Sequence, residues 1–498
     1  MDDTHDVGKT TDLPGLLAAV DSIRGAVATE GSGRFRGWRP GIRRRRFGVS
    51  CLNLAHYLAL RHRDIRPLQR GLMRFGLSSL GRLESRVLAS LDSVATALRG
   101  LSSDHGGRQL AFPSPRQFFR GERLLEANTA ELFGPPLNGR GGRILVTLSS
   151  DAATDDGAVL ALAKAGADAV RINCAHDDPS SWAAMIKHVR SAGCSVGRRL
   201  KILMDIAGPK CRTADVLTPP GRKHLIPGDR LLLSRSGLRP LAASPFQATL
   251  SLPQVIDRLT GGALVSVDDG RFGGVVEAMT DDGAVLRIDF AKRDGGKLKP
   301  QKGLNFPDTD LGLSPLTEKD LADLDFVAAH ADLIGYSFVE SAANILLLQD
   351  ELAKRRRDWA AIGLVAKIET PKAVRNLPEL IVQAAGRQPF AVMIARGDLA
   401  IEIGFERLAE MQEEILWLCE AAHVPVIWAT QVLESLVKTG MPSRGEMTDA
   451  AMAARAEGVM LNKGPHVAAA IDALDGLLRR MAEHQFKKTP RLRALQSW

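Results

Sequence analysis

The segment IGLVAKIETPKAVRNLPELIVQAAGRQPFAVMIARG, residues 362–397, has the pattern of one strand–helix–strand unit. Its first and last runs, 362–368 and 390–397, are short and rich in apolar residues, which is typical of buried strands. The residues between them have the apolar spacing of an amphipathic helix. Parallel strands need a helical crossover of this kind, so the segment predicts a fold with a parallel sheet.

The same alternation continues outward in both directions, from Arg143 to Lys463. Residues 215–303 interrupt it with Gly- and Asp-punctuated β runs that lack helices, which predicts a small inserted all-β domain. Without this insertion about 250 residues remain, the usual length of a barrel of eight βα units. The eight predicted strands are RILVTL (143–148), DAVRIN (168–173), LKILMDI (200–206), LIGYSF (333–338), IGLVAKI (362–368), FAVMIARG (390–397), PVIWAT (425–430) and GVMLNK (458–463).

The sequence therefore predicts an α/β fold, a (β/α)8 TIM barrel of residues 142–214 and 304–498 with a β-barrel lid domain, residues 215–303, inserted after the third strand. Residues 1–141 precede this pattern and predict an N-terminal helical extension. Its expected parts are a poorly ordered segment (1–33) with one short helix (13–27), an Arg-rich arm (34–46), a pair of antiparallel helices (50–100) and a linker (101–141). The arm contains seven arginines, and we expect it to be solvated or to contact an acidic partner or nucleic acid.

The composition is that of a globular protein with an excess of basic residues. The net charge of +9 suits anionic partners such as phosphorylated metabolites, nucleic acid or acidic lipid. Aromatic residues make up only 5%, so no stacking platform is visible and nucleic-acid binding is not expected as the main role. Five cysteines without a CxxC pattern oppose a disulfide framework and a zinc site. No apolar run is long enough to span a membrane, so we expect a cytoplasmic protein without a membrane partner.

Charged residues occupy the carboxyl ends of the predicted strands, where the active sites of TIM barrels lie. Positions i and i+2 of a strand face the same way, so Arg171 pairs with Asn173 and Lys367 with Glu369. Asp398 follows the next strand, which brings two carboxylates together at the barrel rim. Taken alone, an Arg or Lys at a strand end is more often a surface charge, and a Glu or Asp is more often a cap or a salt-bridge partner. Together, two carboxylates surrounded by cations predict a Mg²⁺ or Mn²⁺ site beside a phosphate site.

At these residues the chain resembles the pyruvate kinase family. The strongest matches are the motif KIE (367–369), MIARGDLAIEI (393–403) and WATQVLESLVKTGMPSRGE (428–446). Further matches are RINCAH (171–176), MDIAGPKCRT (204–213), VDDGRF (267–272) and KGLNFPD (302–308), and the likeness spans about 143–484. The resemblance implies a Mg²⁺-dependent enzyme that transfers the phosphoryl group of phosphoenolpyruvate to ADP and yields pyruvate and ATP.

The resemblance also implies a role for each catalytic position. Lys367 would stabilise the transferring phosphoryl group, and Glu369 and Asp398 would hold the divalent metal. Arg171 would bind the phosphate of phosphoenolpyruvate, and Thr430 would help the enol intermediate to gain its proton.

The remaining positions concern substrate and nucleotide binding. Gly397, with Arg396 beside it, would let the backbone approach the substrate carboxylate. The residues that would line the nucleotide-phosphate side are Asn173, His176, Arg212 and Lys302.

Lys210 indicates how the enzyme meets its need for a monovalent cation. Many family members have Glu at this place and require K⁺, whereas others have Lys. The chain has Lys210 near Asp205, and Ala175 stands where a serine ligand of K⁺ is common. An ammonium group supplies the missing positive charge, so we expect K⁺ not to be required. The alternative is that Lys210 is an exposed surface charge.

Two loops depart from the family pattern: LSSDA (148–152) after the first strand and NKGPH (462–466) after the eighth. The family's C-terminal effector domain has no counterpart in the sequence, so effector control is expected to be missing or different. These departures favour a catalytically weak or inactive phosphometabolite sensor as an alternative, and an enolpyruvate aldolase or lyase on a related barrel is a second. The extension, residues 1–141, could mediate self-association or bind a protein partner, and the sequence does not decide between them.

Overall fold

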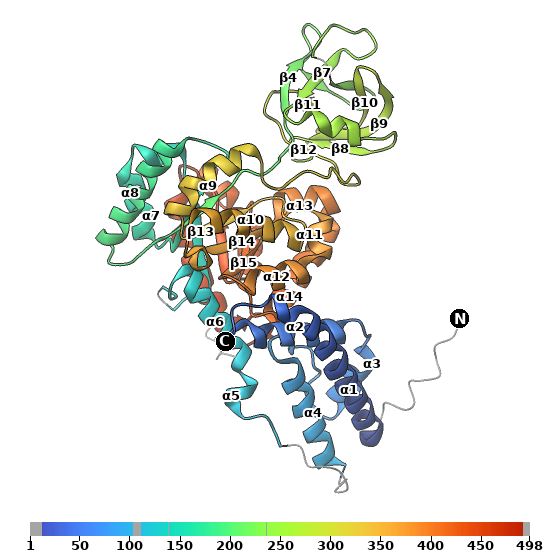
Figure 1. The fold of residues 1–498 in the computed structure, drawn as a ribbon, viewed down its shortest axis with the longest axis vertical. Helices are drawn as coiled ribbons and strands as arrows, with labels where there is room; N and C mark the ends of the chain where they lie inside the picture. Colours follow the sequence, from blue (N-terminus) through green and yellow to red (C-terminus); the bar gives the residue numbers. More distant parts are fainter. Residues whose placement is uncertain (1–11, 103–110, 138, 236, 492–498) are drawn as a thin grey trace.

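The computed structural model describes residues 12–102, 111–137, 139–235 and 237–491. Eight parallel strands close into a barrel in the order β1-β17-β16-β15-β14-β13-β3-β2, so the predicted (β/α)8 fold is confirmed (Figure 1). The strands are β1 (Arg143–Thr147), β2 (Ala169–Asn173), β3 (Lys201–Asp205), β13 (Leu333–Tyr336), β14 (Gly363–Ile368), β15 (Phe390–Ala395), β16 (Val426–Ala429) and β17 (Gly458–Leu461). Strand β15 ends before Arg396, which was expected in the strand but begins a helix.

Helices follow the strands and cover the barrel. Several begin at a side-chain cap, as the polar residues before them favour; Ser341 and Asn344, for example, form a reciprocal capping box at α10. The barrel helices are α7 (Asp156–Ala165), α8 (Pro179–Ser195), α9 (Glu318–His330), α10 (Ala342–Arg355), α11 (Pro371–Arg375), α12 (Leu377–Ala385), α13 (Arg396–Ile403), α14 (Phe405–Ala421), α15 (Glu434–Thr439), α16 (Arg444–Ala453) and α17 (Val467–His484).

An inserted β domain leaves the barrel after β3. Its main sheet has seven strands in the order β12-β8-β9-β10-β6-β7-β4, and β5 pairs with β11. The strands are β4 (Thr213–Leu217), β5 (His224–Leu225), β6 (Arg230–Ser234), β7 (Phe246–Leu250), β8 (Leu264–Val267), β9 (Phe272–Thr280), β10 (Gly283–Ala291), β11 (Gly296–Lys297) and β12 (Leu304–Asn305). The domain has its own apolar core and stands on the side of the barrel opposite the N-terminal helices (Figure 1).

The N-terminal extension is more ordered than its composition suggested. A helix of 26 residues, α1 (Leu13–Trp38), covers most of the segment expected to be poorly ordered; residues 1–11 of that segment lie outside the described part. Leu16, Leu17 and Val20 are buried against the following helices, and this apolar contact accounts for the helix. The other helices are α2 (Phe47–Arg61), α3 (Arg66–Arg74), α4 (Val87–Leu101), α5 (Pro115–Phe118) and α6 (Arg120–Phe133).

The Arg-rich arm contacts the barrel through its backbone and Arg44, while its other six arginines are exposed. The backbone amides of Arg43 and Arg44 donate to the carbonyl of Gly386 over 2.7 and 2.8 Å. The Arg44 guanidinium donates to the carbonyl of Gln388 over 2.7 Å and pairs with Glu131 over 2.9 Å. Burial lowers the pKa of Arg44 to about 10. Carbonyl groups at and after the end of α12 therefore accept from the backbone amides of Arg43 and Arg44 and from the Arg44 guanidinium.

Two polar side chains fasten the extension to the barrel. Asn53 of α2 donates to the carbonyl of Ala421 over 2.8 Å and accepts from the amide of Val87 over 3.0 Å. His423 of the barrel lies 2.9 Å from Ser50 Oγ and 3.0 Å from the Ser85 carbonyl. Burial lowers the pKa of His423 to about 4, so its ring is neutral at physiological pH. The extension is thus docked by specific hydrogen bonds as well as by apolar contact.

Leu132 and Phe133 at the end of α6 close the amino end of the barrel. They belong to the same buried cluster as the inward side chains Leu145, Met393 and Met460. Polar side chains lie at the opposite, carboxyl end of the barrel, where β3 continues into the inserted domain. None of the described helices is long and apolar enough to cross a bilayer.

The buried carboxyl of Glu420 on α14 should make stability depend on pH. Burial, reinforced by Glu84 and Glu457 and opposed by Lys487, raises the pKa of Glu420 from 4.5 to about 7. Between these values the folded state binds a proton that the unfolded state releases, so stability falls as the pH rises through this window. Glu420→Gln should therefore reduce the difference in melting temperature between pH 5 and pH 8 by roughly 2 °C.

Differential scanning fluorimetry across this pH range measures the effect. Glu414→Gln is the matched control, because Glu414 lies on the same helix with an exposed side chain. An identical pH profile for Glu420→Gln and the control would contradict the assignment.

Candidate active site

Lys367 on β14 is the centre of a buried polar cluster at the carboxyl end of the barrel. Its Nζ lies 2.9 Å from Glu369 Oε1 and 3.7 Å from Asp205 Oδ2, and it donates to Ser337 Oγ over 2.8 Å. Burial alone would lower the pKa of Lys367, but the two carboxylates outweigh it and raise the pKa. Lys367 is therefore a fixed cation in a site largely shielded from water.

Asp205 at the end of β3 joins this lysine to Arg171. Arg171 on the adjacent strand β2 donates from Nε to Asp205 Oδ2 over 2.7 Å, and its Nη2 forms an ion pair with the same oxygen over 2.5 Å. Burial opposes ionisation of Asp205, yet Lys367 and Arg171 hold its pKa below the ordinary value. One carboxylate thus aligns the two cations side by side in the site.

The two carboxylates expected to bind metal lie near each other. Glu369 Oε2 accepts from the amide of Phe338 over 2.6 Å. Burial raises the pKa of Glu369 and the charge of Asp398 raises it further, while Lys367 opposes them. A dication between the two carboxylates would relieve this repulsion.

The donor set fits Mg²⁺, which is usually bound by one or two carboxylates and completed by water and substrate oxygens. In the described part of the chain, His, Cys, Asp and Glu side chains form no cluster of three or more that could hold a metal by itself. A cation held by these two carboxylates would complete its coordination with other ligands.

Lys210 neutralises Asp398. Its Nζ lies 2.5 Å from Asp398 Oδ1, whereas Asp205, grouped with it in the sequence analysis, is paired with Arg171 and Lys367. Burial opposes ionisation of Asp398, but Lys210 holds its pKa below the ordinary value. Lys210 is thus an internal cation of the site and not a surface charge.

Thr430 lies in a strained loop after β16. Its φ is 66°, and its side-chain oxygen is buried without a hydrogen-bond partner among the described residues. A left-handed conformation at a threonine costs energy and is typical of functional sites. A buried hydroxyl without a partner is suited to a bound substrate.

Arg396 holds this loop in place. It donates to the carbonyls of Ala429 and Thr430 over 2.9 and 2.5 Å, and it pairs with Asp449 over 2.5 Å. With these donors occupied, we assign Arg396 to positioning the loop, although the sequence had suggested substrate contact. Gly397, the next residue, lies close to Thr430: a Cβ built at Gly397 would be 3.7 Å from the Thr430 side chain.

The residues assigned to the nucleotide side are brought together only in part. Burial, together with the positive charges of Lys463 and Arg212, lowers the pKa of His176. These three residues therefore share an electropositive region. Lys302 is instead paired with Asp268 of the inserted domain over 2.8 Å.

Asn173 caps its own loop. Its side-chain oxygen accepts from the amide of Ala175 over 3.2 Å. In the strand register Asn173 stands opposite Asp205, so it lies beside the Arg171 pair.

Three participants were missed from the sequence. Ser337 accepts from Lys367, and Asn305 donates to Glu402 over 2.9 Å and lies 3.5 Å from Asp398. Ser337 directly follows β13, so the strand-end rule could have found it. Asn305 and Glu402 meet across nearly one hundred residues of sequence, and no local pattern indicates that contact.

Comparison with known proteins places this geometry in a family. The profile of the pyruvate kinase barrel domain matches residues 140–465. A pyruvate kinase of Geobacillus stearothermophilus is 33% identical over 293 residues, which cover 59% of this chain and 48% of that protein. A pyruvate kinase of Mycobacterium intracellulare is 32% identical over 326 residues, which cover 65% of each protein. The chain spans about half to two thirds of the length of these relatives, and it belongs to the pyruvate kinase family.

Proposed function

We propose that the chain transfers the phosphoryl group of phosphoenolpyruvate to ADP and releases pyruvate and ATP. The observation that carries this proposal is the alignment of Lys367 and Arg171 on Asp205, next to the carboxylates of Glu369 and Asp398. Phosphoryl transfer depends chiefly on positioning and on neutralising negative charge, and this cluster supplies both. The pyruvate kinase names of the relatives support the same reaction.

Glu369 and Asp398 would hold Mg²⁺ or Mn²⁺, which when bound would supply positive charge at the phosphoryl and enolate oxygens. Arg171 would bind the phosphate, and Lys367 would stabilise the phosphoryl group as its bond to the enol oxygen breaks and a bond to ADP forms. Thr430, whose hydroxyl has no protein partner among the described residues, would assist protonation of the enolate carbon.

The electropositive region of His176, Arg212 and Lys463 would receive the nucleotide phosphates. The inserted domain, expected from the sequence at 215–303 and with strands from Thr213 to Asn305, would exclude water on closing.

The direct test is a coupled assay in which lactate dehydrogenase reports pyruvate formed from phosphoenolpyruvate, ADP and Mg²⁺. ATP and pyruvate formation supports the proposal. Binding of phosphoenolpyruvate without turnover would favour a phosphometabolite sensor, and release of inorganic phosphate or carbon–carbon cleavage without ATP would favour a lyase or aldolase. The cytoplasmic location, and self-association or a partner at the extension, stay predictions.

We further propose that the activity is independent of K⁺, because the ammonium of Lys210 is already built into the site. Lys210→Glu places a third carboxylate beside Asp398, so activity at low K⁺ should fall at least about tenfold and then rise with added KCl. Ala175 offers no hydroxyl ligand, so the recovery should be incomplete. The measurement is the coupled assay in KCl against choline chloride at equal ionic strength.

Lys210→Met is the matched control. It removes the charge without adding an oxygen ligand, so its activity should fall without recovering in KCl. A K⁺ response of Lys210→Glu equal to that of the unmodified protein would overturn the proposal.

A further inference from the structure

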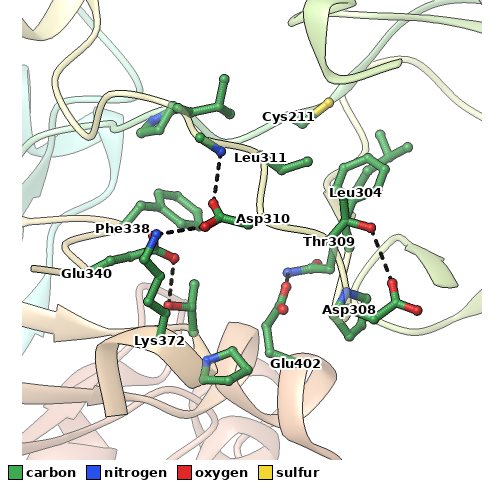
Figure 2. Close-up of a pocket in the computed structure, with 18 of the residues that line it drawn as sticks. Cys211, Leu304, Asp308, Thr309, Asp310, Leu311, Phe338, Glu340, Lys372 and Glu402 are labelled. Atoms are coloured by element: carbon green, nitrogen blue, oxygen red, sulfur yellow. Dashed lines mark hydrogen bonds and ion pairs between the residues drawn. The ribbon is translucent and has the colours of Figure 1, made fainter. Parts of the chain in front are cut away.

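Two cavities of the molecule differ in the charge of their walls. The first, of about 360 Å³, lies where the inserted domain joins the barrel and has four carboxylates in its wall (Figure 2). Lys372 of this wall lies 2.9 Å from Asp310 and 3.3 Å from Glu340. The charges of this cavity are therefore of both signs and largely paired, so it does not select an anion.

The second cavity, of about 470 Å³, lies in the N-terminal extension. Its wall is formed by the end of α3 and the loop after it, by α4, by Phe118 of α5 and by Thr489 near the C-terminus. Arg82 and Arg86 line it, and the residues known to line it include no carboxylate. The volume is within the range of small-molecule binding sites.

The two arginines of this wall differ in their partners. Arg86 pairs with Glu122 of α6, which lies outside the wall, and its guanidinium stands 4.7 Å from the centre of the Phe118 ring. Arg82 is exposed and forms no ion pair or hydrogen bond with any residue that the structure describes. The positive charge of Arg82 is therefore free to bind an anion in the cavity.

Serine hydroxyls line the same cavity. Ser78 Oγ accepts from the amide of Leu80 over 3.3 Å, which leaves its own proton free to donate. The side chains of Ser79 and Ser90 form no hydrogen bond within the described part of the chain, although Ser90 is only 7% exposed. Three hydroxyl donors and a guanidinium thus line one cavity without a protein acceptor for their protons.

The rest of the wall is largely apolar. Leu83 and Val94 are buried, Leu77 is half-buried, and the Phe118 ring lies in the same wall. A phosphate group has three terminal oxygens and accepts from more donors than a carboxylate does. The wall is therefore complementary to a ligand that joins a phosphate to an apolar body.

We propose that this cavity binds a small phosphomonoester with an apolar body, its phosphate on Arg82 and the three free serine hydroxyls. The site lies on the opposite side of the barrel from the inserted domain, so it is separate from the catalytic cluster (Figure 1). The ligand would contact segments that are far apart in the sequence, α4, α5 and Thr489. Its binding should therefore slow the local opening of the extension.

The test is amide hydrogen exchange of the full chain with phenyl phosphate at about 10 mM as the probe. Residues 77–94 should exchange several-fold more slowly when phenyl phosphate is bound. Phenol lacks the anion and inorganic phosphate lacks the apolar body, so each should need at least about a tenfold higher concentration for the same protection. Exchange at 77–94 also separates this site from any binding of the probe at the barrel mouth.

Arg82→Ala should raise the phenyl phosphate concentration for half protection at least about tenfold, because it removes the free guanidinium. Arg70→Ala is the matched control, since Arg70 is exposed on α3 outside the cavity wall. Its protection should equal that of the unmodified protein.

Unchanged exchange at 77–94 in phenyl phosphate would overturn the site. Equal protection by phenol would overturn the role of the anion, and equal protection by inorganic phosphate would overturn that of the apolar wall. An unchanged affinity of Arg82→Ala would overturn the role of the arginine. None of these measurements uses catalysis, so a failure here is distinguishable from a failure of the proposed phosphoryl transfer.

Discussion

Lys367→Met should lower the turnover number at least about a thousandfold while leaving the divalent-metal site able to bind. The ammonium lies between Glu369, Asp205 and Ser337, and no other described cation lies within 4 Å of Glu369. Methionine has a similar length, so the substitution removes the charge with little change in volume. Without the lysine, the carboxylates of Glu369 and Asp205 would repel the negative charge of the phosphoryl group and raise the barrier to its transfer.

Metal binding separates this effect from a loss of structure. Removing a cation beside Glu369 and Asp398 should leave their affinity for Mn²⁺ equal or higher, which electron paramagnetic resonance of bound Mn²⁺ measures. Lys187→Met is the control, because Lys187 is an exposed lysine on the barrel helix α8. Normal turnover by Lys367→Met, with Mn²⁺ still bound, would show that the assigned role is wrong.

Arg140→Met should destabilise the barrel by about 3–5 kcal/mol. The Arg140 side chain is fully buried just before β1, where it pairs with Asp168 and with Asp475 of α17 and donates to the Gly166 carbonyl over 2.7 Å. Removing it takes the shared cation from two carboxylates, of which Asp475 keeps its pair with Arg479 over 2.8 Å while Asp168 keeps only Arg198 at 3.9 Å. This is costlier than losing a surface ion pair, because Asp168 is buried and cannot recover its hydration.

Urea unfolding followed by circular dichroism measures the loss. Arg480→Met on the same helix as Asp475 is the matched control, since Arg480 is exposed and should change stability by less than about 0.5 kcal/mol. Burial already raises the pKa of Asp168 despite Arg140, so the defect should shrink as the pH falls and Asp168 becomes protonated. Equal stability of Arg140→Met and the control would refute the buried network.

The eight strands were predictable because each carries its own local signal. Parallel barrel strands are buried on both faces, so they appear as short apolar runs separated by helical periodicity. The polar residues at their carboxyl ends converge for the same geometric reason, which is why Arg171, Lys367 and Glu369 could be grouped in advance. The exact ends of the strands were harder to predict. Strand β15 stops at Ala395 because Arg396 begins helix α13, and the Arg396 side chain donates to the Ala429 carbonyl at the end of β16.

The extension shows where local signals fail. The composition of residues 1–33 favours a poorly ordered segment, and the arginines of residues 34–46 favour a solvated arm. In the structure α1 continues to Trp38, and Arg44 is satisfied by carbonyls and a carboxylate more than eighty residues away. Those acceptors come from the barrel and from α6, so only the docked structure reveals them.

The sequence by itself determined the barrel, the inserted β domain and the set of charged residues at the barrel mouth, because periodicity and strand ends are local properties of the chain. The tertiary structure alone decided the partners: Asp205 with Arg171 and Lys367, Lys210 with Asp398, and Arg396 with the Thr430 loop. Each of these contacts joins residues that are far apart in the sequence. Their formation depends on Coulomb attraction and burial in the folded barrel, which no spacing of residues along the chain encodes.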